Sequence, residues 1–132
     1  MAPSFKMGQA INRSRETFLA TDLAVANTHW TRLRGLLGLG INDFSNGAGL
    51  WILPCKGVHT LGMRFAIDVI YLNADLRVVD LRSAVEPWRF TPILPKATSV
   101  LELPCHTAVE TKTQIGDTIE ITLSKDCTQH PR

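Results

Sequence analysis

The chain has 132 residues, of which 45% are hydrophobic and 20% are charged, and its formal net charge is +2. A chain of this length suits a single domain that buries roughly two-thirds of its unfolded surface, and the composition is ordinary for a globular protein. Because the charge is nearly balanced and no long run of Lys or Arg occurs, the sequence argues against nucleic acid or an anionic membrane surface as the main partner.

The sequence shows neither a membrane span nor an export signal. No stretch approaches the roughly 18 consecutive apolar residues of a spanning helix, and residues 1–15 lack the apolar core of a signal peptide. Cys55, Cys105 and Cys127 form no C-x-x-C pair. Without a signal peptide, reduced thiols and a cytoplasmic location are expected.

The two ends of the chain are predicted to be flexible tails on either side of one domain. Residues 1–14 are polar and unpatterned, and residues 125–132 are polar as well. We therefore expect a single β-rich domain over residues 15–124. Near its start, the apolar residues interspersed with Thr and Ala over 18–25 favour one or two short strands.

One main helix is predicted over residues 30–37. Trp30, Leu33 and Leu37 fall at i, i+3 and i+7 and form one apolar stripe. The polar residues at 27–28 suit an N-cap, because either side chain can accept a hydrogen bond from the first free amides. The glycines that follow the stripe can end the helix.

From position 50 onward the apolar pattern shifts toward a period of two, which is typical of strands. Strands are predicted at 50–53, 67–72, 76–81, 100–103 and 118–123. Pro87, Pro92 and Pro95 exclude a helix or a central strand over residues 83–98, so we expect an extended surface loop there. Many short strands and one helix predict a mainly β protein, a compact antiparallel β-sandwich or barrel-like single domain.

The strands at 67–72 and 76–81 are predicted to form a hairpin. Its turn-prone centre is Asn73-Ala74-Asp75. Asn73 and Asp75 tolerate a positive φ far better than Leu76 does, so one of them is expected to adopt it.

Asp68 interrupts an otherwise apolar run that begins at Phe65. A charge inside such a strand is costly unless it is paired or hydrogen-bonded. The candidate partners are backbone amides, the nearby Arg64 or His59, and a more distant cation such as Arg34.

Three motifs in this order resemble those of a widespread family, domain of unknown function family 192. The first is Arg-Leu-Arg-Gly-Leu-Leu-Gly at 32–38, and the second is the His-Thr-Leu-Gly-Met-Arg-Phe-Ala-Ile-Asp-Val segment within 59–72. The third is Val-Leu-Glu-Leu-Pro at 100–104, followed by the Ile-Gly-Asp turn at 115–117. The resemblance implies a compact β fold and a candidate site, and it implies no established reaction.

The chain departs from the family pattern at three places. Ala66 stands where the family often has Pro, and Leu76 stands where its hairpin usually has Gly. Cys105-His106 replaces a typical Ala-Gly after the Leu-Glu-Leu-Pro element. The conformation of this last turn is therefore a point for the structure to decide.

Four polar residues of the motifs, together with Met63, indicate a candidate ligand site made of His59, Met63, Arg64, Asp68 and Glu102. The leading hypothesis is an accessory domain that binds a small molecule or a protein in a polar pocket there, without a cofactor. One alternative is a small acid–base enzyme, a hydrolase or isomerase that uses His59 with Asp68 or Glu102. Another is a structural partner in a larger assembly.

Cys55, His59, Cys105 and His106 also suggest a zinc site or a Cys55–His59 nucleophile. Adjacent residues of an extended segment point to opposite sides, so Cys105 and His106 suit one ion poorly. Nothing near Cys55 supplies an orienting group or an oxyanion hole. We therefore predict no metal site and no catalytic set.

Large apolar side chains near the motif are interpreted as core and loop anchors rather than as a binding groove. They are Trp51, Met63, Trp88 and Phe90. Of the four, Trp88 on the proline-rich loop is the side chain that we most expect to be partly exposed.

Overall fold

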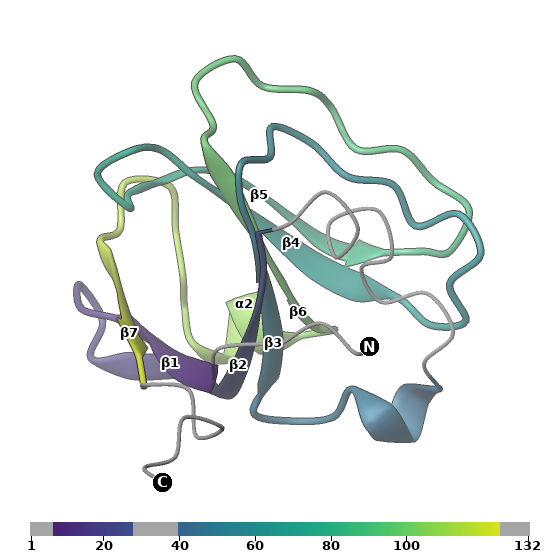
Figure 1. The fold of residues 1–132 in the computed structure, drawn as a ribbon, viewed down its shortest axis with the longest axis horizontal. Helices are drawn as coiled ribbons and strands as arrows, with labels where there is room; N and C mark the ends of the chain where they lie inside the picture. The colour runs from purple at the N-terminus through teal and green to yellow at the C-terminus, as the bar shows by residue number, and fades with distance from the viewer. Residues whose placement is uncertain (1–6, 28–39, 125–132) are drawn as a thin grey trace, which may run out of the picture.

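The computed structural model describes residues 7–27 and 40–124, which form a curled seven-stranded sheet (Figure 1). The strands are β1 (Met7–Asn12), β2 (Thr17–Ala26), β3 (Ala48–Ile52), β4 (Ile67–Leu72), β5 (Val78–Val85), β6 (Ser99–Pro104) and β7 (Ile119–Leu123). A 3-10 helix, η1 (Ile41–Asp43), precedes β3, and a four-residue helix, α2 (Thr107–Glu110), follows β6. No helix in these two ranges is both long and apolar enough to cross a membrane.

The sheet order is β5-β4-β6-β3-β2-β1-β7, and the sheet curls into a half-barrel (Figure 1). β2 and β3 run parallel, and the other neighbouring strands run antiparallel. The curl brings the beginning of β7 to the beginning of β5. There Val78 N–H donates to Asp117 O over 2.9 Å, and Ile119 N–H donates to Leu76 O over 2.8 Å. These bonds join the two ends of the sheet at one corner.

The central strands β4 and β6 are buried at every position. Because side chains alternate between the two faces of a strand, these strands supply two separate cores. Val69, Tyr71 and Val100 belong to one apolar cluster, and Ile70 and Leu101 belong to the other. A fully buried central pair explains why these segments are mostly apolar in the sequence, with Asp68 and Glu102 as the charged exceptions.

The predicted fold class is confirmed, since the protein is mainly β and barrel-like. The parallel β2–β3 pair is the departure from a fully antiparallel sheet. The predicted helix over 30–37 lies outside the described residues, and the described helix α2 was not predicted. Strand β1 lies inside the segment assigned to an N-terminal tail, because its few buried side chains, such as Ala10, give a weak apolar pattern.

The β4–β5 hairpin is confirmed, but the expected position of its positive φ was wrong. Leu76 adopts a φ of 60°, and neither Asn73 nor Asp75 has a positive φ. Asn73 instead uses its side chain, since Oδ1 accepts hydrogen bonds from Asp75 N–H and Arg77 N–H. Leu76 packs against the second apolar cluster, so burial of its side chain offsets the strain of its backbone.

Two long loops, residues 53–66 and 86–98, run side by side beyond the sheet, and we call this pair the double loop (Figure 1). Thr60 is fully buried and connects the two loops: its hydroxyl donates to Glu86 O over 2.6 Å and accepts from Arg89 N–H over 2.9 Å. At Gly57 a Cβ atom would lie 2.7 Å from Pro92 O, so the close approach requires glycine. The extended loop predicted over 83–98 is confirmed from residue 86 onward, with the His-Thr motif as its partner, whereas residues 83–85 belong to β5.

Candidate functional site

Asp68 is fully buried in β4, where backbone amides hold its carboxylate. Oδ1 accepts from Ala84 N–H over 2.9 Å, and Oδ2 accepts from Ala108 N–H over 2.8 Å. His106, the N-cap residue of α2, makes no side-chain capping bond. Asp68 therefore caps α2 from a distant strand. Of the partners predicted for Asp68, the structure shows backbone amides. Arg34, another predicted partner, lies outside the described residues.

Asp68 and Glu102 point to opposite faces of the sheet. Asp68 pairs with Leu103 and Val69 pairs with Glu102 across β4 and β6. Paired residues share a face and neighbours along a strand alternate, so the two carboxyl groups are separated by the sheet. The structure therefore does not bring these two predicted site residues together.

The other predicted site residues are divided between the core and the surface. Met63 is buried in the cluster on the Glu102 face of the sheet, whereas His59 and Arg64 are exposed. His59 Nδ1 accepts from Leu61 N–H over 3.2 Å, and its ring lies 6.2 Å from that of Phe90. A ligand-binding role for the five residues stays a prediction. The contacts described for Asp68, His59 and Met63 are hydrogen bonds to backbone amides and packing in the core.

Glu102 is a carboxyl group enclosed by an apolar core, with 4% of its surface exposed. Desolvation by burial raises its pKa from 4.5 to about 8. No hydrogen bond or ion pair of its side chain occurs within the described ranges. The group is therefore held as a neutral acid at and below neutral pH.

The cysteine and histidine residues considered for zinc do not assemble in the described part of the chain. No group of three or more His, Cys, Asp or Glu side chains is placed there to hold a metal ion. Cys55 Sγ donates to Gly57 O over 3.2 Å. Burial is the main cause that raises the pKa of the Cys105 thiol, which disfavours a reactive thiolate.

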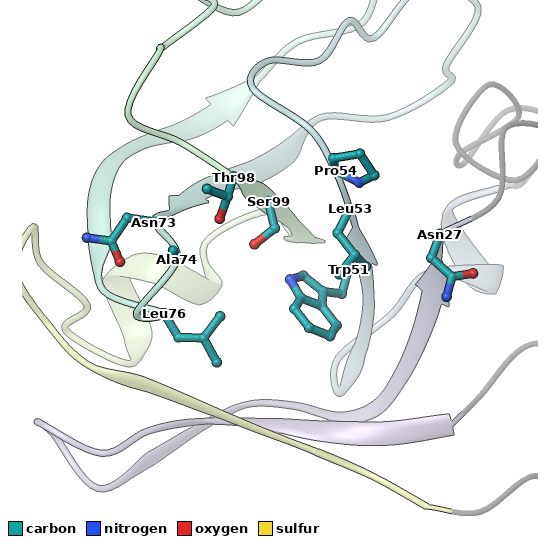
Figure 2. A pocket seen from close by; sticks show the side chains of 9 residues that line it. All are labelled: Asn27, Trp51, Leu53, Pro54, Asn73, Ala74, Leu76, Thr98 and Ser99. Carbon is teal, nitrogen blue, oxygen red and sulfur yellow. The ribbon is translucent and has the colours of Figure 1, made fainter.

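A cleft of about 570 Å³ opens at one end of the half-barrel, between the β4–β5 turn and the end of β3 (Figure 2). Its lining residues are Asn27, Trp51, Leu53, Pro54, Asn73, Ala74, Leu76, Thr98 and Ser99. The register explains how two of them meet. Trp51 pairs with Leu101 across β3 and β6, and Ser99 precedes Leu101 by two positions on the same face of β6.

Two buried polar atoms at this cleft have no hydrogen-bond partner in the described structure: Trp51 Nε1 and Ser99 Oγ. Figure 2 shows both atoms directed toward the space bounded by the turn that carries Ala74 and Leu76. A buried polar group without a partner costs about 1–3 kcal/mol, so such groups are rare in folded proteins. A molecule bound in the cleft can supply the missing partners.

This cleft was not predicted from the sequence. From the sequence, Trp51 is interpreted as a core or loop anchor, and Ser99 is assigned no role. In the sequence, Ser99 is distinguished only as a polar residue at the start of an apolar strand. This is a weak signal of a binding site, because strand ends are often polar. The two residues become neighbours only through the β3–β6 register.

The fold and the cleft define a class of protein: a mainly β half-barrel with a ligand-sized cleft at its open end. Comparison with known families then places the chain. A family model, DUF192 ("Uncharacterized ACR"), matches residues 10–121. The chain belongs to this family, and the expected resemblance is confirmed.

Individual relatives agree with this assignment. A UPF0127 protein of Thermococcus sibiricus is 31% identical over 115 residues, which cover 83% of this chain and 72% of the relative. A Novosphingobium aromaticivorans protein of unknown function has a TM-score of 0.71 at 18% identity, with 86% of this chain and 83% of that chain covered. A Sinorhizobium meliloti structure, described as a "putative transcription regulator", has a TM-score of 0.74 at 16% identity, with 92% and 96% covered. Both structural likenesses show the fold alone.

Proposed function

We propose that this protein is a non-catalytic accessory domain that binds a small molecule in the cleft at Trp51 and Ser99. The observation that carries the proposal is the pair of buried, unpartnered polar atoms, Trp51 Nε1 and Ser99 Oγ, at the cleft wall. A bound ligand would satisfy both atoms and would recover the free energy that their desolvation costs.

The position and size of the cleft support a ligand site. Small-molecule sites are mostly apolar hollows of about 300–1,000 Å³ with a few polar groups, and the mouths of β-barrels are a common place for them. The volume of about 570 Å³ falls in this range. Leu53, Pro54 and Leu76 supply apolar surface around the two polar atoms.

The acid–base enzyme receives less support. Both oxygens of Asp68 accept backbone hydrogen bonds, and the side chain of Glu102 lies on the other face of the sheet from Asp68. His59 is on the surface of the double loop. Proton transfer needs a donor and an acceptor within hydrogen-bond reach of one substrate, and these groups are spread apart.

The proposal is tested by a nuclear magnetic resonance titration that follows the indole N–H of Trp51. A library of small fragments that includes neutral, anionic and cationic compounds is added to 15N-labelled protein. We expect some fragments to shift the Trp51 indole resonance together with the amides of residues 73–76 and 98–99. Trp51→Phe assigns the resonance, and Trp88→Phe serves as the matched control, because Trp88 lies outside the cleft. If no fragment of any charge perturbs these resonances, the proposal is wrong.

The exposed apolar side chains of the double loop favour a second candidate function, self-association as a structural unit. Trp88, Phe90 and Ile93 are 65–76% exposed. Trp88 is exposed as predicted, but Phe90 is more exposed still, at 75% against 65%, and is not a core residue. Exposed large apolar residues can mark contact surfaces. Sedimentation velocity over a range of concentrations tests this candidate, with Trp88→Ser/Phe90→Ser as the disrupting variant. A monomer at all concentrations would refute it.

A further inference from the structure

We infer that the cleft selects an uncharged, largely apolar molecule that carries a carbonyl-type hydrogen-bond acceptor. This inference rests on the proposed function, because it specifies the ligand of the same site. The ligand class would include amides, ketones and lactones, and it would leave out phosphates, carboxylates and ammonium compounds.

The described part of the cleft wall carries no charged side chain, which disfavours ionic ligands. Within residues 7–27 and 40–124, nine residues line the cleft, and none of them is Asp, Glu, Lys or Arg. An ion that enters such a site loses its hydration and gains no opposite charge in return. Charged compounds are therefore expected to bind more weakly than neutral compounds of the same shape.

The two unpartnered atoms determine the polar group of the ligand. An indole N–H is only a donor, so Trp51 requires an acceptor. The Ser99 hydroxyl both donates and accepts. A carbonyl oxygen can accept from both residues. In an amide, the carbonyl can accept from Trp51 while the N–H donates to Ser99.

The rest of the lining matches an apolar molecular body. Leu53, Pro54 and Leu76 present aliphatic surface, and the Trp51 ring adds an aromatic face. Leu76 sits at the turn with a positive φ, so its side chain is held at the rim by a defined backbone conformation. Apolar contacts with these groups would supply most of the affinity, and the hydrogen bonds would supply the selectivity.

The test uses a matched series of probes on one aromatic ring: acetophenone, benzamide, benzoate, benzamidine and isopropylbenzene. Binding is followed by the Trp51 indole resonance and by the amides of residues 73–76. We expect acetophenone and benzamide to bind at least about tenfold more tightly than benzoate and benzamidine. A desolvated hydrogen bond contributes about 0.5–1.5 kcal/mol, so isopropylbenzene should bind up to about tenfold more weakly than acetophenone.

Variants separate the inference from the proposed function. Ser99→Ala should weaken acetophenone and benzamide severalfold and leave isopropylbenzene unchanged, whereas the matched exposed variant Ser83→Ala should change nothing. If benzoate or benzamidine binds more tightly than the neutral probes, or if isopropylbenzene equals acetophenone, the inference is wrong and the ligand site remains. If no probe and no fragment binds, both the inference and the proposed function are wrong.

Discussion

His106 adopts a left-handed backbone conformation, with a φ of 79°. The family resemblance places a typical Gly at this position, and the structure explains why. The turn between β6 and α2 needs a positive φ, which an L-residue with a Cβ adopts at a cost of roughly 1–2 kcal/mol. The side chain of His106 is exposed and offers little packing in return.

We predict that His106→Gly stabilises the protein by roughly 0.5–1 kcal/mol, because relief of the backbone strain exceeds the added entropy of the unfolded chain. Chemical denaturation should show a higher midpoint with an unchanged slope. Glu110→Gly is the control, since this exposed residue lies in α2 with a helical backbone and should lose about 1 kcal/mol. A lower midpoint for His106→Gly would contradict the prediction.

Asp68 gives a second prediction for a single residue. Removing the carboxylate in Asp68→Ala leaves Ala84 N–H and Ala108 N–H without acceptors, so we expect a loss of roughly 2–4 kcal/mol. Asp68→Asn keeps one acceptor oxygen and turns an N–H₂ group toward the other amide. Its loss should therefore lie between zero and that of the alanine variant.

Denaturant melts of the two Asp68 variants decide this point. Asp22→Ala is a matched control, because Asp22 is exposed and should stay within about 0.5 kcal/mol of the parent. An unchanged midpoint in both Asp68 variants would show that the two backbone hydrogen bonds contribute nothing to stability.

The strands show which parts of the fold the sequence could predict. Alternation in β7 and mostly apolar runs in β3, β4 and β6 identified these elements, because burial on one or two faces imposes those patterns. Strand β1 was missed since its buried residues are small or polar, such as Ala10 and Asn12. Asn12 is buried because Nδ2 donates to Thr113 Oγ1 and to Asp117 Oδ2, which are partners from the far end of the chain.

The cleft could not be predicted for a related reason. Trp51 and Ser99 are far apart in the sequence and become neighbours through the pairing of β3 with β6. The burial of Asp68, by contrast, could be predicted from the sequence. Its need for a partner followed from one local contrast, a charge among apolar residues, although the identity of the partner amides required the fold.

The double loop supplies a prediction for an element. Thr60→Val keeps the shape of the buried side chain but leaves Arg89 N–H without the threonine oxygen and Glu86 O without its donor. We expect a loss of about 1–3 kcal/mol and faster hydrogen exchange at the amides of residues 89–91.

Hydrogen exchange distinguishes a local effect from a global one. The amides of β4 and β6 should exchange no faster than the global stability of the variant predicts, because the hydrogen bonds between these strands are separate from the double loop. Thr122→Val on the exposed side of β7 is the matched control and should change neither region. Equal exchange at 89–91 in the parent and Thr60→Val would refute the proposed connection between the loops.

At the scale of the half-barrel, the titration of Glu102 is expected to change the free energy of unfolding of the whole domain. Glu102 lies in the central strand β6, and burial raises its pKa to about 8 in the folded protein. In the unfolded chain this group titrates near 4.5, its ordinary value. The folded state therefore binds a proton more tightly than the unfolded state does between these two pH values.

We predict that the protein loses stability as pH rises from about 4.5 to about 8, since a folded-state pKa above the unfolded value favours folding only while the group is protonated. The loss should reach a few kcal/mol, at roughly 1.4 kcal/mol for each pKa unit. Glu102→Gln cannot ionise, so its stability should match that of the parent near pH 4.5 and exceed it above pH 8. Urea melts across this pH range measure the difference, and Glu110→Gln, which changes an exposed carboxylate, should follow the parent. If the parent and Glu102→Gln keep the same difference at every pH, a cation or a hydrogen-bond donor compensates the charge of Glu102 in the folded protein.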